Sequence, residues 1–131
     1  MAEPIMKKVS GDGVEINLAI WQGNGKPILC VHGITANCRC WDVLAAGLVP
    51  QYNVMAMDLR GRGRSGKPDK GYSLDHHIRD IHCLLDDLDI EKISPLVSDS
   101  LRILLASADL KLLVIRWQIY KVGFISPDPY L

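Results

Sequence analysis

Two glycine-bearing turns carry residue types that could bind or activate a ligand. His32-Gly33 follows the apolar residues 28–31, and the run GRGRSG at residues 61–66 follows the apolar residues 54–59. Backbone N–H groups in a glycine-rich turn can surround an anion, so residues 61–66 are a candidate phosphate-binding loop. The second turn fits the spacing G-x-G-x-x-G, and with Lys67 it also fits G-x-x-x-x-G-K.

A nucleotide site at residues 61–66 conflicts with the residues that follow. Pro68 stands where a P-loop needs Ser or Thr to hold magnesium, and residues 67–71 continue the loop where either motif needs a helix to start. Nucleotide binding therefore stays a secondary interpretation. The simplest interpretation of Arg60, Arg62 and Arg64 is a solvated loop whose charges pair with nearby acids.

The cysteines could in principle bind a metal ion, but their spacing does not favour it. Cys38-Arg39-Cys40 lacks a second pair of ligands at the spacing that zinc sites use. With no secretory signal at the N-terminus, we expect all four cysteines (Cys30, Cys38, Cys40 and Cys83) to be free thiols in a reducing cytoplasm. We predict neither a metal site nor a cofactor.

Composition narrows the class of protein further. The 131 residues are 48% apolar and 23% charged, and 15 basic side chains balance 15 acidic ones. This balance argues against a nucleic-acid partner or binding to an anionic membrane. The apolar residues 101–115 are interrupted by Arg102, Asp109 and Lys111, so we predict no membrane span. A single cytoplasmic domain over residues 1–131 is the expectation.

The spacing of apolar residues predicts the strands and helices that the candidate turns connect. Residues 5–9 and 15–21 flank Gly11-Asp12-Gly13, which predicts a β-hairpin. Ser73 is a suitable N-cap for a helix whose apolar residues recur at helical spacing. The predicted strands are 28–31, 52–58, 93–97 and 112–119, and the predicted helices are 40–48, 73–88 and 101–108.

Strands 28–31 and 52–58, joined through a helix, form a βαβ unit, which requires parallel strands. In open parallel sheets, ligands bind beyond the carboxyl ends of the strands. Both glycine-bearing turns lie at such ends. We therefore predict an α/β fold: a mainly parallel sheet with an N-terminal β-hairpin and flanking helices, and a site at the carboxyl edge.

This order of elements, with the His32-Gly33 turn and the run DLRGRGRS at residues 58–65, resembles the front half of an α/β-hydrolase domain. The resemblance is closest to the branch of esterases, lactonases and haloalkane dehalogenases. It is strong over residues 9–97 and weak over residues 98–131. It implies an incomplete, truncated α/β-hydrolase fold, since such domains often run to roughly 200–250 residues.

The resemblance also implies roles for matching positions. The N–H groups of Ile34 and Leu101 would form an oxyanion hole, and Ser100 would be the nucleophile. His32 and Gly33 would be structural residues near the site. Trp41 would lie near the pocket wall, although a core aromatic is the simpler interpretation and the one we favour. The implied substrate is a small ester or related acyl compound.

The candidate nucleophile departs from the family pattern. Ser98 and Arg102 replace the two glycines of the G-x-S-x-G turn, and Asp99 becomes a dehalogenase-type nucleophile if the alignment shifts by one residue. All four histidines precede Ser100, although the family places its base after the nucleophile. We therefore predict little or no activity. The alternative is a non-catalytic fragment that acts through protein association, including self-association along an exposed sheet edge.

Overall fold

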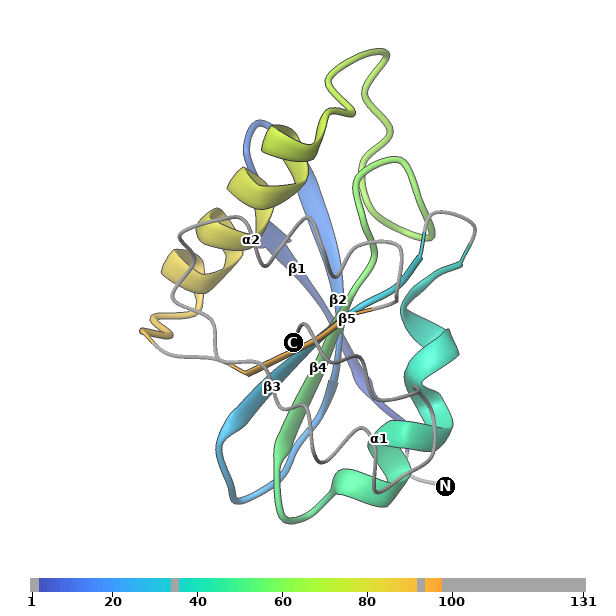
Figure 1. Ribbon diagram of the computed structural model, residues 1–131, viewed down its shortest axis with the longest axis vertical. Helices are drawn as coiled ribbons and strands as arrows, with labels where there is room; N and C mark the ends of the chain where they lie inside the picture. The colour runs from blue at the N-terminus through green and yellow to red at the C-terminus, as the bar shows by residue number, and fades with distance from the viewer. Residues whose placement is uncertain (1–2, 34–35, 92–93, 98–131) are drawn as a thin grey trace, which may run out of the picture.

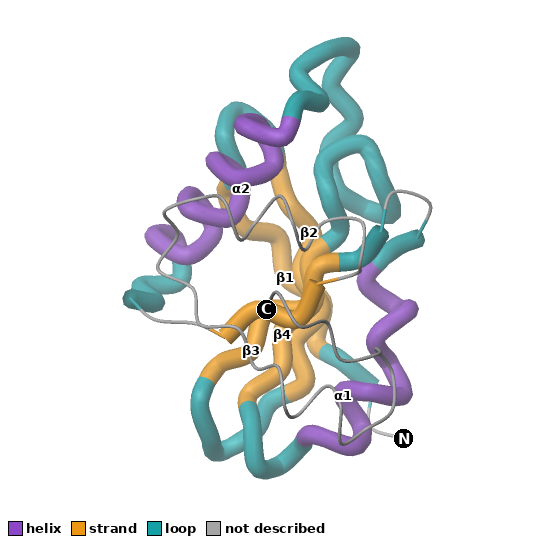
Figure 2. The backbone as a smooth tube through the Cα atoms, in the orientation of Figure 1, coloured by secondary structure: helices purple, strands orange, loops and turns teal. Residues whose placement is uncertain are grey.

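The computed structural model describes residues 3–33, 36–91 and 94–97. Figure 1 shows a twisted sheet with helices on both faces. The described strands form one five-stranded sheet in the order β1-β2-β4-β3-β5, and Figure 2 shows the strands converging at the centre of the molecule. The predicted α/β architecture is confirmed.

The first two strands form the predicted hairpin. β1 (Ile5–Ser10) and β2 (Glu15–Trp21) are antiparallel, with Ser10 opposite Glu15. Gly13 has φ +69° in the connecting turn, a conformation that glycine adopts without a steric penalty. β2 then pairs antiparallel with β4 (Asn53–Met57), which attaches the hairpin to the rest of the sheet.

The remaining strands form the parallel part of the sheet. β3 (Pro27–Val31) lies between β4 and β5 (Ser94–Val97) and is parallel to both. Val31 is opposite Met57 on one side and Val97 on the other, so the three strands end at one edge of the sheet. These three strands are parallel, as expected. The antiparallel hairpin makes the described sheet as a whole mixed.

Alternate residues of β3 and β4 point to opposite faces, and each face has its own helical cover. The 3-10 helix η1 (Cys38–Trp41) and helix α1 (Asp42–Leu48) cover one face, and helix α2 (Leu74–Asp87) covers the other (Figure 1). Leu29 and Met55 pack with the α2 residues, whereas Ile28 and Val54 pack with the α1 residues.

Local signals account for the helix boundaries. Ser73 caps α2 through a hydrogen bond from the His76 N–H, as predicted. The helix predicted at residues 40–48 instead starts as a 3-10 turn at Cys38, because the Asn37 side chain accepts a hydrogen bond from Arg39 N at 2.9 Å. The predicted helix 101–108 and strand 112–119 lie outside the described residues.

Candidate active site

His32 joins the carboxyl ends of β3 and β4. Its side chain is buried, its Nε2 accepts a hydrogen bond from Leu59 N at 3.0 Å, and its Nδ1 lies 2.6 Å from Gly33 O. These partners select the tautomer with the proton on Nδ1, because Nε2 acts as an acceptor. Burial lowers the pKa of His32, so the ring is neutral at pH 7. With both nitrogens bonded to backbone, His32 has no free nitrogen for proton transfer.

Asp58 organises the loops that follow β3 and β4. Its buried carboxylate accepts hydrogen bonds from Cys38 N at 2.7 Å, Asn17 Nδ2 at 2.9 Å and Arg64 N at 3.0 Å. Burial alone would raise the pKa of Asp58, but these hydrogen bonds outweigh it and the pKa is lowered. The ionised carboxylate therefore holds η1 and the β4–α2 loop next to β2.

Gly63 shows why this loop needs glycine. Its φ is +51°, and a Cβ atom there would lie 2.3 Å from Asp58 Cγ. A side chain at position 63 would therefore displace the carboxylate. The loop continues irregularly to Ser73 before α2 begins, so no helix starts directly after Gly66 and the phosphate-loop interpretation gains no support.

Arg60 is buried, and the prediction that it is solvated was wrong. Arg60 Nε donates to Asp80 Oδ2 and Arg60 Nη2 to Asp80 Oδ1, both at 2.7 Å, and the two side chains are 3% and 0% exposed. Arg60 also donates to Gly71 O at 2.6 Å and to Asp12 O at 2.8 Å. The prediction holds for the exposure of Arg62 and Arg64, which lie at the surface.

Trp41, where η1 ends and α1 begins, has its side chain in the core. It is 8% exposed and packs in the hydrophobic cluster that contains Leu44 and Leu48. Its Nε1 is buried, and no described residue forms a hydrogen bond with it. This position matches the core interpretation that the sequence favoured.

The structure does not describe every residue of the proposed catalytic site. Ile34, Ser100 and Leu101 lie outside the described residues, whereas His32, Gly33 and Trp41 lie within them. What the structure brings together is the pair of strand ends that precede the proposed oxyanion hole, with Val31 opposite Val97.

Sequence reasoning missed the environment of His77. From the sequence, the simplest interpretation of His76, His77 and His82 is the polar face of the helix that starts after Ser73. In the structure, however, His77 is half-buried, and its Nδ1 is buried without a hydrogen-bond partner among the described residues. Burial lowers the pKa of His77. A sequence signal was available, because position 77 lies four residues before Ile81 on the buried face of α2.

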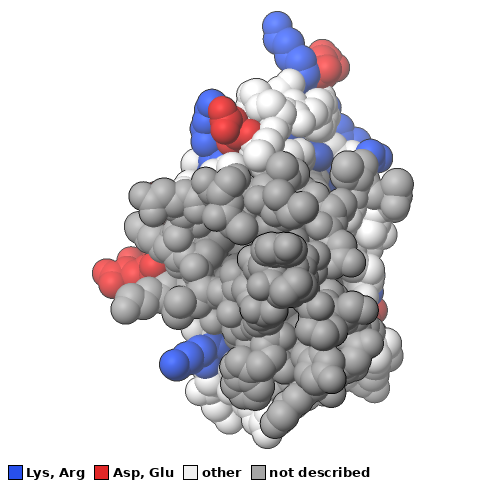
Figure 3. Space-filling model, viewed as in Figure 1, with Lys and Arg blue, Asp and Glu red and all other residues white. Residues whose placement is uncertain are grey.

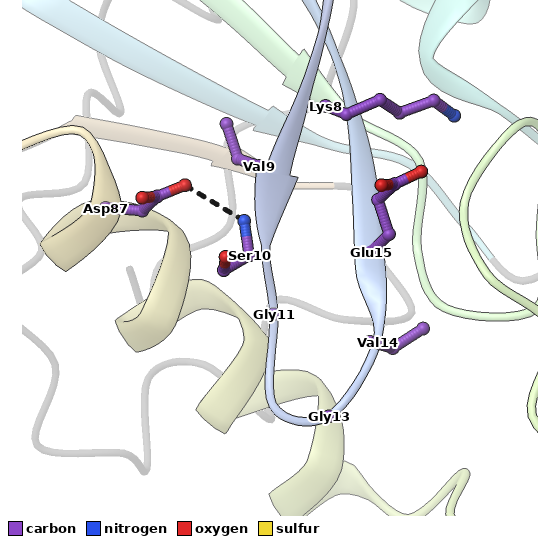
Figure 4. Close-up of a pocket in the computed structure, with 8 residues that line it drawn as sticks. All are labelled: Lys8, Val9, Ser10, Gly11, Gly13, Val14, Glu15 and Asp87. Atoms are coloured by element: carbon purple, nitrogen blue, oxygen red, sulfur yellow. Dashed lines mark hydrogen bonds between the residues drawn. The ribbon is translucent and has the colours of Figure 1, made fainter.

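His77 helps to line a cavity of about 390 Å³ beside the β4–α2 loop. A second cavity of about 440 Å³ lies along the β1–β2 hairpin (Figure 4), where Asp87 Oδ2 accepts a hydrogen bond from Ser10 N at 3.0 Å. Lys8, Glu15 and Asp87 bring opposite charges to this second cavity. Figure 3 shows acidic and basic side chains next to one another at the upper end of the molecule.

The described residues meet neither the requirements of a metal site nor those of a membrane-spanning helix. No group of three His, Cys, Asp or Glu side chains there could hold a metal ion, and all four cysteines are free. Burial raises the pKa of the Cys38 thiol to about 12, so this thiol is a poor nucleophile. In the same part of the chain, no helix combines the length and apolarity that a membrane crossing requires.

Several known proteins are similar to this chain in sequence or in structure. A non-heme chloroperoxidase from Kitasatospora aureofaciens is 38% identical over 84 residues, which cover 63% of this chain and 30% of that protein. An epoxide hydrolase from Vigna radiata matches 78% of this chain with 27% identity and a TM-score of 0.72. A haloalkane dehalogenase from Agrobacterium tumefaciens matches 74% with 28% identity and a TM-score of 0.67.

The chain covers only part of these proteins, namely 34% of the epoxide hydrolase and 33% of the dehalogenase. A family model described as "alpha/beta hydrolase fold" matches residues 26–100, which run from the turn before β3 past the end of β5. This match includes more than half of the chain and every candidate site residue except Leu101. The chain therefore belongs to the alpha/beta hydrolase fold family.

Proposed function

We propose that this chain carries the front half of a hydrolase site that acts on an ester or related acyl substrate. The parallel pairing of β3 with β5, with Val31 opposite Val97, is the observation that supports this proposal. Ile34 follows Val31 by three residues and Leu101 follows Val97 by four. The chain therefore leaves both strands at one edge of the sheet, where two backbone donors and a nucleophile could converge.

In the proposed site, the Ser100 hydroxyl oxygen attacks the acyl carbon and its proton passes to a base. The N–H groups of Ile34 and Leu101 stabilise the negative charge that develops on the carbonyl oxygen. Collapse of the tetrahedral intermediate expels the alcohol and leaves an acyl-enzyme that water hydrolyses.

We propose that the 131-residue chain alone performs this reaction poorly. No histidine follows Ser100 in the sequence, and His32 has both ring nitrogens bonded to backbone. Ser98 and Arg102 add side chains where the family's nucleophile turn has glycines. An unactivated serine is a weak nucleophile, so catalysis would be slow even with the oxyanion hole in place.

Asp99 offers a second candidate chemistry, displacement of halide from an alkyl carbon. The similarity to a haloalkane dehalogenase favours keeping this alternative. The two candidates differ in the nucleophile, Ser100 or Asp99, and in the electrophile, an acyl carbon or an alkyl carbon.

Covalent labelling with a fluorophosphonate, read by intact mass, tests the serine proposal. If Ser100 is activated, the chain gains one label, and Ser100→Ala prevents labelling while Asp99→Asn does not. If a folded sample is not labelled, Ser100 is not an activated nucleophile. An ester-turnover assay on the same samples tests the proposed low activity, which turnover at ordinary enzymatic rates would contradict. Halide release that depends on Asp99 would favour the alternative.

A further inference from the structure

We propose that the cavity beside the β4–α2 loop, here called the loop cavity, binds a small carboxylate with an apolar body. Its volume of about 390 Å³ lies within the range of small-molecule sites. The described residues that line it are Leu59, Arg60, Gly61, Arg62, Tyr72 and His77. None of these residues belongs to the proposed oxyanion hole, so the inference does not depend on the serine proposal.

The charges that line the loop cavity favour an anion. Two arginines and no carboxylate are among its described lining residues. Asp80 neutralises Arg60 through two hydrogen bonds of 2.7 Å. Arg62 is exposed, and its side chain makes no hydrogen bond or ion pair with the other described residues. The guanidinium of Arg62 is therefore available for a ligand carboxylate, which it can bind through two parallel hydrogen bonds.

His77 provides a polar contact for the same carboxylate. Its Nδ1 is buried and has no hydrogen-bond partner in the part of the chain that the structure describes, which is an unfavourable state for a ring nitrogen. In the tautomer with the proton on Nδ1, a turn of the ring toward the cavity would let Nδ1 donate a hydrogen bond to a ligand oxygen, which would remove this penalty. Among the described residues, the loop cavity thus combines an exposed arginine side chain that has no hydrogen-bond or ion-pair partner with a buried ring nitrogen that has none.

Leu59 and the ring of Tyr72 supply the apolar wall. The Tyr72 hydroxyl donates to Pro68 O, which fixes the ring. A Cβ atom at Gly61 would lie 2.5 Å from Tyr72 Cε1, so the ring packs directly on the backbone of the loop. Such a wall suits a flat or branched hydrocarbon body rather than an inorganic anion.

Titration of the full chain with benzoate, followed by calorimetry and by the ring signals of His77 in NMR spectra, tests this proposal. We expect a dissociation constant of about 1 mM, which is reasonable for a ligand of this size. Benzamide, the neutral analogue, and inorganic phosphate, which lacks the apolar body, should each bind about 10-fold more weakly.

Two variants locate the site. Arg62→Gln should weaken benzoate binding about 10-fold, and His77→Phe should weaken it about 5-fold. Arg64→Gln is the matched control, because Arg64 is an exposed arginine of the same loop that does not line the cavity, and it should leave the affinity unchanged. Circular dichroism verifies that each variant is folded.

Three results would overturn the proposal. The first is the absence of benzoate binding, and the second is equal affinity for benzoate and benzamide or for benzoate and phosphate. The third is an equal loss of affinity in Arg62→Gln and Arg64→Gln, which would show that the loop attracts anions only through its overall charge.

Discussion

The ion pair between Arg60 and Asp80 joins three segments that are far apart in the sequence. Asp80 Oδ1 accepts a hydrogen bond from Asp12 N at 2.9 Å, in the hairpin turn, while Arg60 donates to Asp12 O and to Gly71 O. Every oxygen of the Asp80 carboxylate has a donor, so its burial is fully compensated. Removing one member of such a pair leaves a buried charge without a partner.

We therefore expect Asp80→Asn to lower the free energy of unfolding by about 3–5 kcal/mol, measured by urea denaturation. The exposed pair Arg39–Asp42 is the matched control, and Asp42→Asn should change stability little. If Asp80→Asn does not fold, the double variant Arg60→Met with Asp80→Leu should recover part of the loss, because it removes both charges. Equal effects of Asp80→Asn and Asp42→Asn would contradict this account.

The buried His32 makes stability depend on pH. The folded chain holds the pKa of His32 below its ordinary value of 6.5, so the unfolded chain binds the proton more readily. The free energy of unfolding should therefore fall as the pH is lowered through about 6.5, and it should keep falling until the folded ring also protonates. His77, whose pKa is also lowered by burial, acts in the same direction.

Urea denaturation between pH 8 and pH 5 measures this dependence. His32→Gln should flatten the profile, because it removes the titrating ring but retains an acceptor for Leu59 N. A profile for His32→Gln as steep as that of the wild type would assign the pH dependence to other groups.

At the amino ends of the parallel strands, the β2–β3 turn and the segment before β4 contact each other through backbone hydrogen bonds. Asn24 N donates to Pro50 O at 2.8 Å, and Asn53 N donates to Lys26 O at 3.1 Å. A Cβ atom at Gly25 would lie 1.7 Å from Gln51 O, which is backbone and has little freedom to move. The turn between β2 and β3 therefore needs glycine to approach the segment that links α1 to β4.

Gly25→Ala should accordingly lower the free energy of unfolding by about 1–3 kcal/mol, through overpacking. Gly47 is the matched control, since it lies within α1 and a Cβ atom there meets nothing within 4 Å. Gly47→Ala should raise stability by about 0.5–1 kcal/mol, because alanine favours the helix and restricts the unfolded chain. Thermal melts of both variants measure the difference, and a stabilising Gly25→Ala would show that the turns do not constrain each other.

At the scale of the whole molecule, the outer strands of the described sheet are the edges that could pair with another chain. β1 and β5 are these outer strands, and β1 carries Lys7 and Lys8, which discourage pairing along its edge. Residues 94–97 carry no charge, so we propose that self-association occurs through β5, with Pro95 limiting the number of hydrogen bonds that the edge can donate.

We expect the purified chain to form concentration-dependent dimers or larger species and to unfold over a broad temperature range. Size-exclusion chromatography with light scattering at several concentrations measures the first effect, and calorimetry the second. A monomer at every concentration with a sharp melting transition would contradict the proposed association.

Local patterns in the sequence determined most of the elements. The alternation in residues 15–21, the helical spacing after Ser73 and the turn residues around Asp12 predict elements that the structure contains, because periodicity and capping depend on near neighbours in the chain. The same patterns, with the His32-Gly33 turn and residues 58–65, led to the alpha/beta hydrolase fold family, which the comparisons confirm.

Only the tertiary structure decided which of these residues meet. Arg60 and Asp80 are 20 positions apart, and nothing in the spacing of either predicts that the fold buries them against each other. The antiparallel pairing of β2 with β4 likewise joins strands that are separated in the chain by β3 and α1. The helical spacing places His77 on the buried face of α2, but the cavity that His77 lines with residues of the β4–α2 loop is formed only by the fold. Long-range partners are selected by the packing of complete elements, which local periodicity does not encode.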